Sequence, residues 1–232
     1  MIPFVIAATL AAAPAAAPAQ CPDLLTAEAY ICKAMQATKA GEESKAADMF
    51  EQGAAVAGAR EQAARMLAAA ANLWISAGQP DKAAADLDKA LALNVFEGPQ
   101  RGEALLDRAR AAEAKGDLTT ARAKLSEATP LIAEDPFLWY FSAGLAMREG
   151  NIPVAQSAVA KALTLAPGDA AVLFEAGHVA HVAGDDAAAR SYWNQALQRD
   201  PNGASGKSAR EALALLPVPL TVKEPTPLPK KN

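Results

Sequence analysis

A glycine followed five residues later by an alanine recurs five times along this sequence of 232 residues. The glycines are separated by steps of 37, 38, 34 and 34 residues, in otherwise helix-forming sequence. A fixed period in this range is typical of stacked supersecondary units that bury their apolar faces against one another. The sequence therefore predicts a repeat array, an architecture that favours binding over chemistry. The five pairs are Gly41 and Ala46, Gly78 and Ala83, Gly116 and Ala121, Gly150 and Ala155, and Gly184 and Ala189.

Further positions recur on either side of each glycine. A larger apolar residue nine positions after the glycine and a small residue twelve after it form, with the alanine, an i, i+4, i+7 stripe on one helix. A bulky residue eleven positions before the glycine and a small one seven before it mark another helix. Each unit is thus predicted to contain two helices with the glycine in the turn between them. The downstream positions are Phe50, Leu87, Leu125, Val159 and Trp193, with Gly53, Ala90, Ala128, Ala162 and Ala196; the upstream ones are Tyr30, Leu67, Leu105, Trp139 and Leu173, with Ala34, Ala71, Ala109, Ala143 and Gly177.

The composition supports an all-α class and restricts the classes of molecule that the protein is predicted to bind. Alanine dominates and aromatic residues make up 5% of the chain, so helix propensity is high and strand signal is low. Small side chains bury little area each, so stability must come from many interfaces between repeats. The formal net charge of −4 offers no basic surface for a phosphate backbone, and nucleic acid is not predicted as a partner.

The first 19 residues differ from the rest. A short apolar run from Ile2 to Leu10 is followed by small residues that end at Ala19, which is typical of a secretory signal peptide cleaved after Ala19. Pro14 and Pro18 interrupt the run before it reaches the length of a membrane span, so no span is expected in the mature chain. The protein is therefore predicted to be periplasmic or otherwise exported.

The chain has two cysteines, Cys21 and Cys32. In an exported protein we expect them to form a disulfide bond that joins the start of the mature chain to the first helix. Two free thiols are one alternative. A lipid anchor on Cys21 is another, although Pro18 and Gln20 depart from the residues that precede the cysteine in bacterial lipoproteins.

The repeating unit resembles the tetratricopeptide repeat, a helix-turn-helix of 34 residues with small residues where its helices touch and often a proline at its end. The resemblance covers residues 24–203 and is best in the last two units. In earlier units Gly58, Val95 and Ala133 replace the terminal proline, and Pro130 is expected to end its helix early. The resemblance implies a right-handed α-solenoid of about five repeats over residues 20–203. The last two units carry Trp139, Gly150, Ala155, Ala162 and Pro167, then Gly177, Gly184, Ala189, Ala196 and Pro201.

Two segments follow the array. Residues 204–216 place Ala209, Ala212, Leu213 and Leu216 on one helical face, which predicts a capping helix that covers the last apolar surface. Residues 217–232 contain five prolines and three lysines, a composition that predicts a disordered, extended tail.

No catalytic site or cofactor is predicted. The segment from Gly203 to Ser208 resembles a phosphate-binding loop only superficially, because Pro201 stands where that motif requires a glycine. His178 and His181, with Glu175, share the spacing of metal ligands on a helix, but a closed zinc site requires three or four ligands. A metal- or cofactor-handling accessory protein that uses this pair is the alternative function, and a self-assembling array is a third.

The resemblance further implies that the first helices of successive units line a concave groove that holds a peptide or protein segment. We expect such a scaffold, assisting assembly of an envelope complex, to bind through aromatic, arginine and histidine side chains. Leu106 and Phe137 are also expected on this face. For Phe137 and Phe174, the alternative is that their side chains pack between repeats. The predicted groove residues are Arg65, Asn72, Arg110, Tyr140, Arg148, Phe174, His178 and His181.

Overall fold

The computed structural model describes residues 21–217, and these residues form eleven α-helices and no strand. The predicted signal peptide, and the predicted tail beyond Pro217, lie outside the described residues. The all-α class is confirmed. The helices are α1 (Ala27–Lys39), α2 (Glu43–Val56), α3 (Arg60–Ser76), α4 (Pro80–Ala92), α5 (Gly98–Ala114), α6 (Leu118–Ala128), α7 (Pro136–Arg148), α8 (Ile152–Leu165), α9 (Ala170–Val182), α10 (Asp186–Arg199) and α11 (Ala204–Leu215).

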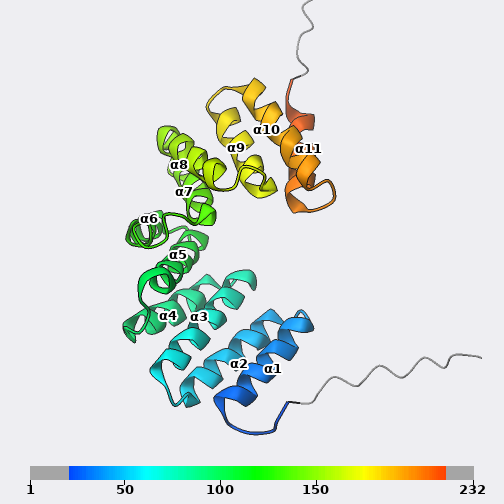
Figure 1. The fold of residues 1–232 in the computed structure, drawn as a ribbon. Helices are drawn as coiled ribbons and strands as arrows, with labels where there is room; N and C mark the ends of the chain where they lie inside the picture. Colours follow the sequence, from blue (N-terminus) through cyan, green and yellow to red (C-terminus); the bar gives the residue numbers. More distant parts are fainter. Residues whose placement is uncertain (1–20, 218–232) are drawn as a thin grey trace, which may run out of the picture.

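The helices form five successive pairs followed by α11, and the pairs stack into a curved solenoid (Figure 1). The first helix of each pair packs against the second, and each second helix packs against the first helix of the next pair. The ends of the array, α1 and α11, lie far apart along the curve (Figure 1). Because each pair contacts mainly its neighbours, the core is a row of small clusters along the array.

The five turn glycines all adopt the left-handed backbone conformation, with φ between +69° and +86°. A residue with a side chain is strained in this conformation, which accounts for glycine at this position in every unit. In the last three units, the residue after the glycine caps the second helix. The side chains of Asp117, Asn151 and Asp185 accept hydrogen bonds from backbone N–H groups in the first turn. One dipeptide thus ends one helix and begins the next.

The small residues predicted between the paired helices are buried. The alanine five residues after each glycine is fully buried in every unit, as are four of the five small residues seven before it. In the fifth unit that position is Gly177, where an added Cβ would overlap the indole ring of Trp193. Two of the bulky positions, Leu67 and Trp139, are only partly buried. The repeat register is therefore confirmed, although not every bulky residue is a core anchor.

We predict that Ala155→Leu destabilises the protein by about 1 to 3 kcal/mol. Ala155 is fully buried where α8 packs against α7, so a leucine there forces side chains or helices apart. Chemical denaturation measures the loss. The control is Gln156→Leu, which adds the same side chain at the next, exposed position of α8. Equal stabilities for the two variants would contradict the close approach of the helices at Ala155.

A pair of carboxyl groups lies where the first two units meet. Asp86 of α4 is buried; its Oδ1 pairs with Lys89 at 3.0 Å, whereas its Oδ2 accepts no hydrogen bond from the described residues. Glu51 of α2 accepts a hydrogen bond from the indole Nε1 of Trp74 at 2.7 Å. Burial raises the pKa of Glu51, and its contact with Asp86 raises this pKa further, because a protonated Glu51 can donate to the neighbouring carboxylate.

We predict that Glu51→Gln stabilises the protein at neutral pH. Since the folded-state pKa of Glu51 is raised, its contribution to stability is complete below the ordinary pKa of 4.5 and is lost as the pH rises through the folded-state pKa. Glutamine still accepts from Trp74 and can donate to Asp86 at every pH. The melting temperature of Glu51→Gln should exceed that of the wild type at pH 7, and this difference should shrink on acidification. With Glu103→Gln, an exposed control, no such trend is expected; a lower melting temperature for Glu51→Gln at pH 7 would contradict this account.

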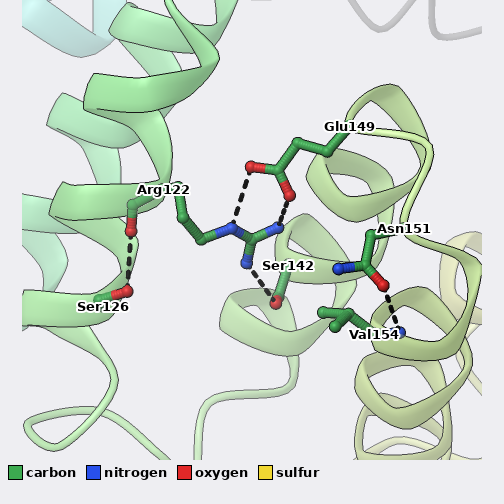
Figure 2. A network of polar contacts seen from close by, with 6 residues as sticks. All are labelled: Arg122, Ser126, Ser142, Glu149, Asn151 and Val154. Carbon is green, nitrogen blue, oxygen red and sulfur yellow. Dashed lines mark hydrogen bonds and ion pairs between the residues drawn. The ribbon is translucent and has the colours of Figure 1, made fainter.

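The array is least tightly packed between its third and fourth units. Helix α6 ends at Ala128, just before Pro130 as expected, and the extra residues before α7 leave α6 and α7 with a smaller contact than the other consecutive helices described. A polar network spans this junction (Figure 2). Arg122 of α6 donates to both carboxylate oxygens of Glu149, at 3.1 and 2.5 Å, and to Ser142 Oγ of α7 at 3.5 Å. This bidentate ion pair fixes the angle between units where apolar contact is reduced.

The two ends of the described chain are also held. At the start, Cys21 and Cys32 form a disulfide bond, which joins the segment before α1 to that helix. At the other end, α11 packs against α9 and α10, in the segment for which a capping helix was predicted. Ala209 and Leu216 are buried there, whereas Leu215 is exposed.

Candidate functional site

The side chains predicted to form a groove fall into three hollows along the first helices. Arg65 and Asn72 line the first hollow, between α3 and α5. The central hollow, bordered by α5, α7 and α9, is lined by Arg110, Tyr140 and Arg148. The C-terminal hollow, between α9 and α11, is lined by Phe174, His178 and His181.

The first hollow has a volume of about 250 Å³ and contains a closed hydrogen-bond network. Asn72 donates through Nδ2 to Asp107 Oδ2 at 2.6 Å, and Arg110 Nη1 donates to Asn72 Oδ1 at 3.2 Å and to Asp107 Oδ1 at 2.8 Å. These bonds tie α3 to α5. Arg65 remains exposed beside the network. Both polar atoms of Asn72, and Nη1 of Arg110, are thus used within the protein.

The central hollow, of about 410 Å³, opens where successive first helices diverge. Helix α3 packs against α5, and α9 packs against α7 and α11, whereas α5 and α7 make at most a marginal contact. Two interactions that involve charged side chains cross this gap. Glu113 of α5 pairs with Arg148 of α7, and the guanidinium of Arg110 lies 5.4 Å from the ring centre of Phe137.

Aromatic rings form one wall of the central hollow. Phe137 and Tyr140 of α7 stack with their ring centres 5.8 Å apart, and Phe137 is 40% exposed. Burial raises the pKa of the Tyr140 hydroxyl, and the carboxylates of Glu175 and Asp169 raise it further. Tyr140 therefore stays protonated and keeps its hydroxyl as a hydrogen-bond donor. The stacked rings are of the kind that anchors partner side chains at interfaces.

Glu175 of α9 is the buried acidic group of the central hollow, and it was considered from the sequence only as a metal ligand. Its side chain is buried, and burial raises the pKa of its carboxyl group although His178 and Arg148 act to lower it. A signal was present in the repeat register: Asp107, Phe141 and Glu175 all lie nine residues before a turn glycine, and all three line these hollows.

The C-terminal hollow is smaller, about 230 Å³, and mainly apolar. Phe174 lies half-buried against Trp193, whose indole Nε1 donates to the carbonyl oxygen of Phe174 at 3.1 Å. His181 also lies beside Trp193, and its Nδ1 is 2.7 Å from Asp186 Oδ1. The exposed Leu215 of α11 completes the hollow, so the capping helix contributes to this surface.

One residue expected on the groove face lies elsewhere. Leu106 is buried, 3% exposed, in the apolar cluster with Leu105 and Leu138. The expectation that Leu106 lines the groove was therefore wrong. Its position is equivalent to that of Tyr140 and Phe174, but at this divergent junction the side chain turns into the core and fills space next to α7.

The geometry does not support the alternative that Glu175, His178 and His181 bind a metal ion. Within residues 21–217, no three His, Cys, Asp or Glu side chains converge in an arrangement that could hold a metal ion. His181 pairs with Asp186, whereas Glu175 faces the central hollow.

Among the helices of residues 21–217, none combines the length and the apolar character needed to cross a bilayer.

Comparisons with known proteins agree with this architecture. The model of the tetratricopeptide repeat family matches residues 69–137 and 143–204, more than half of the chain. A search of curated protein sequences gave no match. The first helix pair lies outside the family match, yet α1 and α2 pack against each other as the later pairs do.

Solved structures show the same fold at low sequence identity. YrrB, described as a tetratricopeptide repeat protein with an unusual peptide-binding site, is 20% identical with a TM-score of 0.58, over 82% of this chain and 92% of YrrB. PilW, a type IV pilus biogenesis factor, is 20% identical with a TM-score of 0.65, over 79% of this chain and 82% of PilW. PilF of Pseudomonas aeruginosa is 17% identical with a TM-score of 0.64, over 82% and 83% of the two chains.

The turn glycines, the buried small residues and the stacked helix pairs all follow the pattern that the family model and these structures share. Proteins with this architecture are generally non-enzymatic scaffolds for other proteins. The chain belongs to the tetratricopeptide repeat family.

Proposed function

We propose that this protein is an exported, non-enzymatic scaffold that binds a peptide or protein segment along its first helices and assists the assembly of an envelope complex. The observation that carries the proposal is the set of aromatic side chains on α7 and α9, together with Arg148 of α7, at the central and C-terminal hollows. Side chains of these types dominate the binding energy at protein interfaces. The fold shared with YrrB, described as having a peptide-binding site, supports this use of the surface.

Two observations support the exported location and the envelope role. The disulfide bond between Cys21 and Cys32 suits an oxidising compartment, and the sequence before it is typical of a signal peptide. The fold is also that of PilW, a pilus biogenesis factor. Fractionation of cells that express the full chain tests the location: we expect the protein in the periplasmic or secreted fraction, starting at Gln20.

Co-purification from native extract tests the binding surface. The wild type is compared with the triple variant Tyr140→Ala, Arg148→Ala, Phe174→Ala, which removes anchors from both hollows. The matched control, Gln52→Ala, Lys124→Ala, Gln198→Ala, changes two exposed residues and the partly buried Lys124, all on second helices. We expect the same partner with the wild type and with the control, and its loss with the first variant while circular dichroism stays unchanged. Retention of that partner by the first variant would overturn the assignment of the surface.

A further inference from the structure

The central hollow contains a buried carboxylate with no bonded partner. Glu175 is 8% exposed, and no hydrogen bond or ion pair to it is found among the described residues; its carboxylate oxygens are not fully buried atoms and face the hollow. Burying a charged group without a partner costs free energy, and a carboxyl group held in this way at the wall of a cleft is a candidate binding group. The hollow beside it is large enough for a side chain from another molecule.

The other charges at the central hollow are already paired. Arg148 pairs with Glu113, and Arg110 pairs with Asp107 while lying over the ring of Phe137. Each of the two arginines is therefore paired with another carboxylate, and Glu175 has no ion pair of its own, although Arg148 also acts on it electrostatically. His178, the remaining titratable neighbour that acts on Glu175, is exposed on the same helix. The charge that this hollow lacks is positive.

The repeat itself provides a comparison for Glu175. Asp107 occupies the equivalent position in the third unit, nine residues before its turn glycine, and Arg110 three residues later neutralises it. In the fifth unit the residue three later is His178. Gly144 of α7 lies beside this carboxylate: a Cβ added there would be in van der Waals contact with Glu175 Oε1, at 3.6 Å, and glycine leaves that space open. The fifth unit thus keeps the carboxylate without the internal cation and leaves one side of it uncovered.

We propose that the central hollow binds a basic side chain of the partner segment, with arginine preferred over lysine. This assignment rests on the proposed function and specifies its partner. A guanidinium can form two hydrogen bonds with the Glu175 carboxylate and stack on the ring of Tyr140, whereas an ammonium group lacks the planar surface for stacking. Glu175 then forms an ion pair with the partner's arginine, as Asp107 does with Arg110 within the protein.

Peptide titration tests the chemistry of the ligand. The probe is a short capped peptide of glycine, serine and alanine with one central arginine, compared with the same peptide carrying citrulline, the neutral analogue of arginine. Amide shifts of the full chain are followed by NMR. We expect the arginine peptide to shift the signals of Gly144 and Tyr140 and to bind at least about tenfold more tightly than the citrulline peptide, about 1.4 kcal/mol. Equal binding of the two peptides, or no binding of either up to about 1 mM, would overturn the inference.

Variants of Glu175 separate a ligand-binding role from a structural one. Glu175→Gln should lose the preference for arginine and yet melt at a higher temperature than the wild type at neutral pH, because a buried charge without an ion pair is removed. The matched control is Glu211→Gln, which removes one exposed carboxylate on α11 and should change neither property. If Glu175→Gln kept the arginine preference, the carboxylate would not be the binding group.

The lysines of the chain's own tail are the competing occupant, and truncation after Pro217 tests them. We expect the truncated chain to bind the arginine peptide as the full chain does. A rise in affinity of about tenfold or more on truncation would mean that the tail fills the hollow, and the assignment to a partner would fail. Co-purification tests the proposed function separately. If the triple variant lost its partner while the arginine and citrulline peptides bound equally, the scaffold role would stand and only the preference for a basic ligand would be rejected.

Discussion

Replacing Trp74 with alanine should cost about 3 to 5 kcal/mol of folding free energy, the largest loss expected from a single truncation in this chain. Trp74 of α3 is fully buried, the largest of the fully buried side chains described. Its neighbours in the core cluster are mostly alanines, among them Ala47, Ala71 and Ala83. An alanine has no rotamer with which to fill the void, so the cavity stays open. The same change also removes the indole donor to Glu51.

Equilibrium denaturation in urea measures this loss of stability. Two other variants at tryptophan positions serve as comparisons. Trp74→Phe keeps most of the ring volume and loses the hydrogen bond, so it should fall between the wild type and Trp74→Ala. Trp139→Ala is the matched control, because Trp139 is partly exposed, with its indole Nε1 donating to the carbonyl oxygen of Ala133 and Lys161 lying over its ring. A loss for Trp74→Ala no larger than that for Trp139→Ala would contradict the account of an alanine-lined core.

Gly206→Ala should detach the capping helix, with a loss of about 3 kcal/mol, the upper part of the range for overpacked sites. A Cβ on Gly206 of α11 would overlap the backbone carbonyl of Asp200, at the end of α10. A backbone atom cannot rotate away as a side chain can, so α11 itself must move. Its movement would expose the apolar faces of α9 and α10 and open the C-terminal hollow.

Hydrogen exchange resolves this change along the chain. In Gly206→Ala, amides of α11 should lose protection while those of α3 to α6 keep theirs, because a solenoid transmits a disturbance mainly to neighbouring units. Lys207→Ala, an exposed change one residue later on α11, should leave the exchange pattern of the wild type. Unchanged protection of α11 in Gly206→Ala would show that the two helices do not approach as described.

The repeat pattern predicted the helix pairs because its physical causes are local. A glycine at φ near +70° ends one helix, and small residues at helical spacing allow the next one to pack closely. Gly206 illustrates the limit of such reasoning. In the sequence it belongs to a segment with a superficial likeness to a phosphate-binding loop, whereas in the structure it permits the close approach of α11 to Asp200.

The candidate site was predicted in part. The residues expected in a groove do line hollows on the first helices, but they form three hollows, and Asn72 and Arg110 bond to each other and to Asp107. Leu106 shows why the sequence could not predict which side chains face the groove. Its position in the repeat is that of Tyr140, yet it lies in the core. Whether a position faces a neighbour or solvent depends on the angle between units, which the period does not encode.

The sequence by itself determined the all-α class, the two helices of each unit and the buried small residues between them, since turn geometry and helical periodicity act within a few dozen residues. Only the tertiary structure decided that α5 and α7 diverge, that Arg122 and Glu149 hold this junction, and that Glu175 lies buried and unpaired beside Gly144. These features join side chains of different units. Their charges and contacts depend on how the units stack, because burial and pairing are set by distances between helices rather than by spacing along the chain.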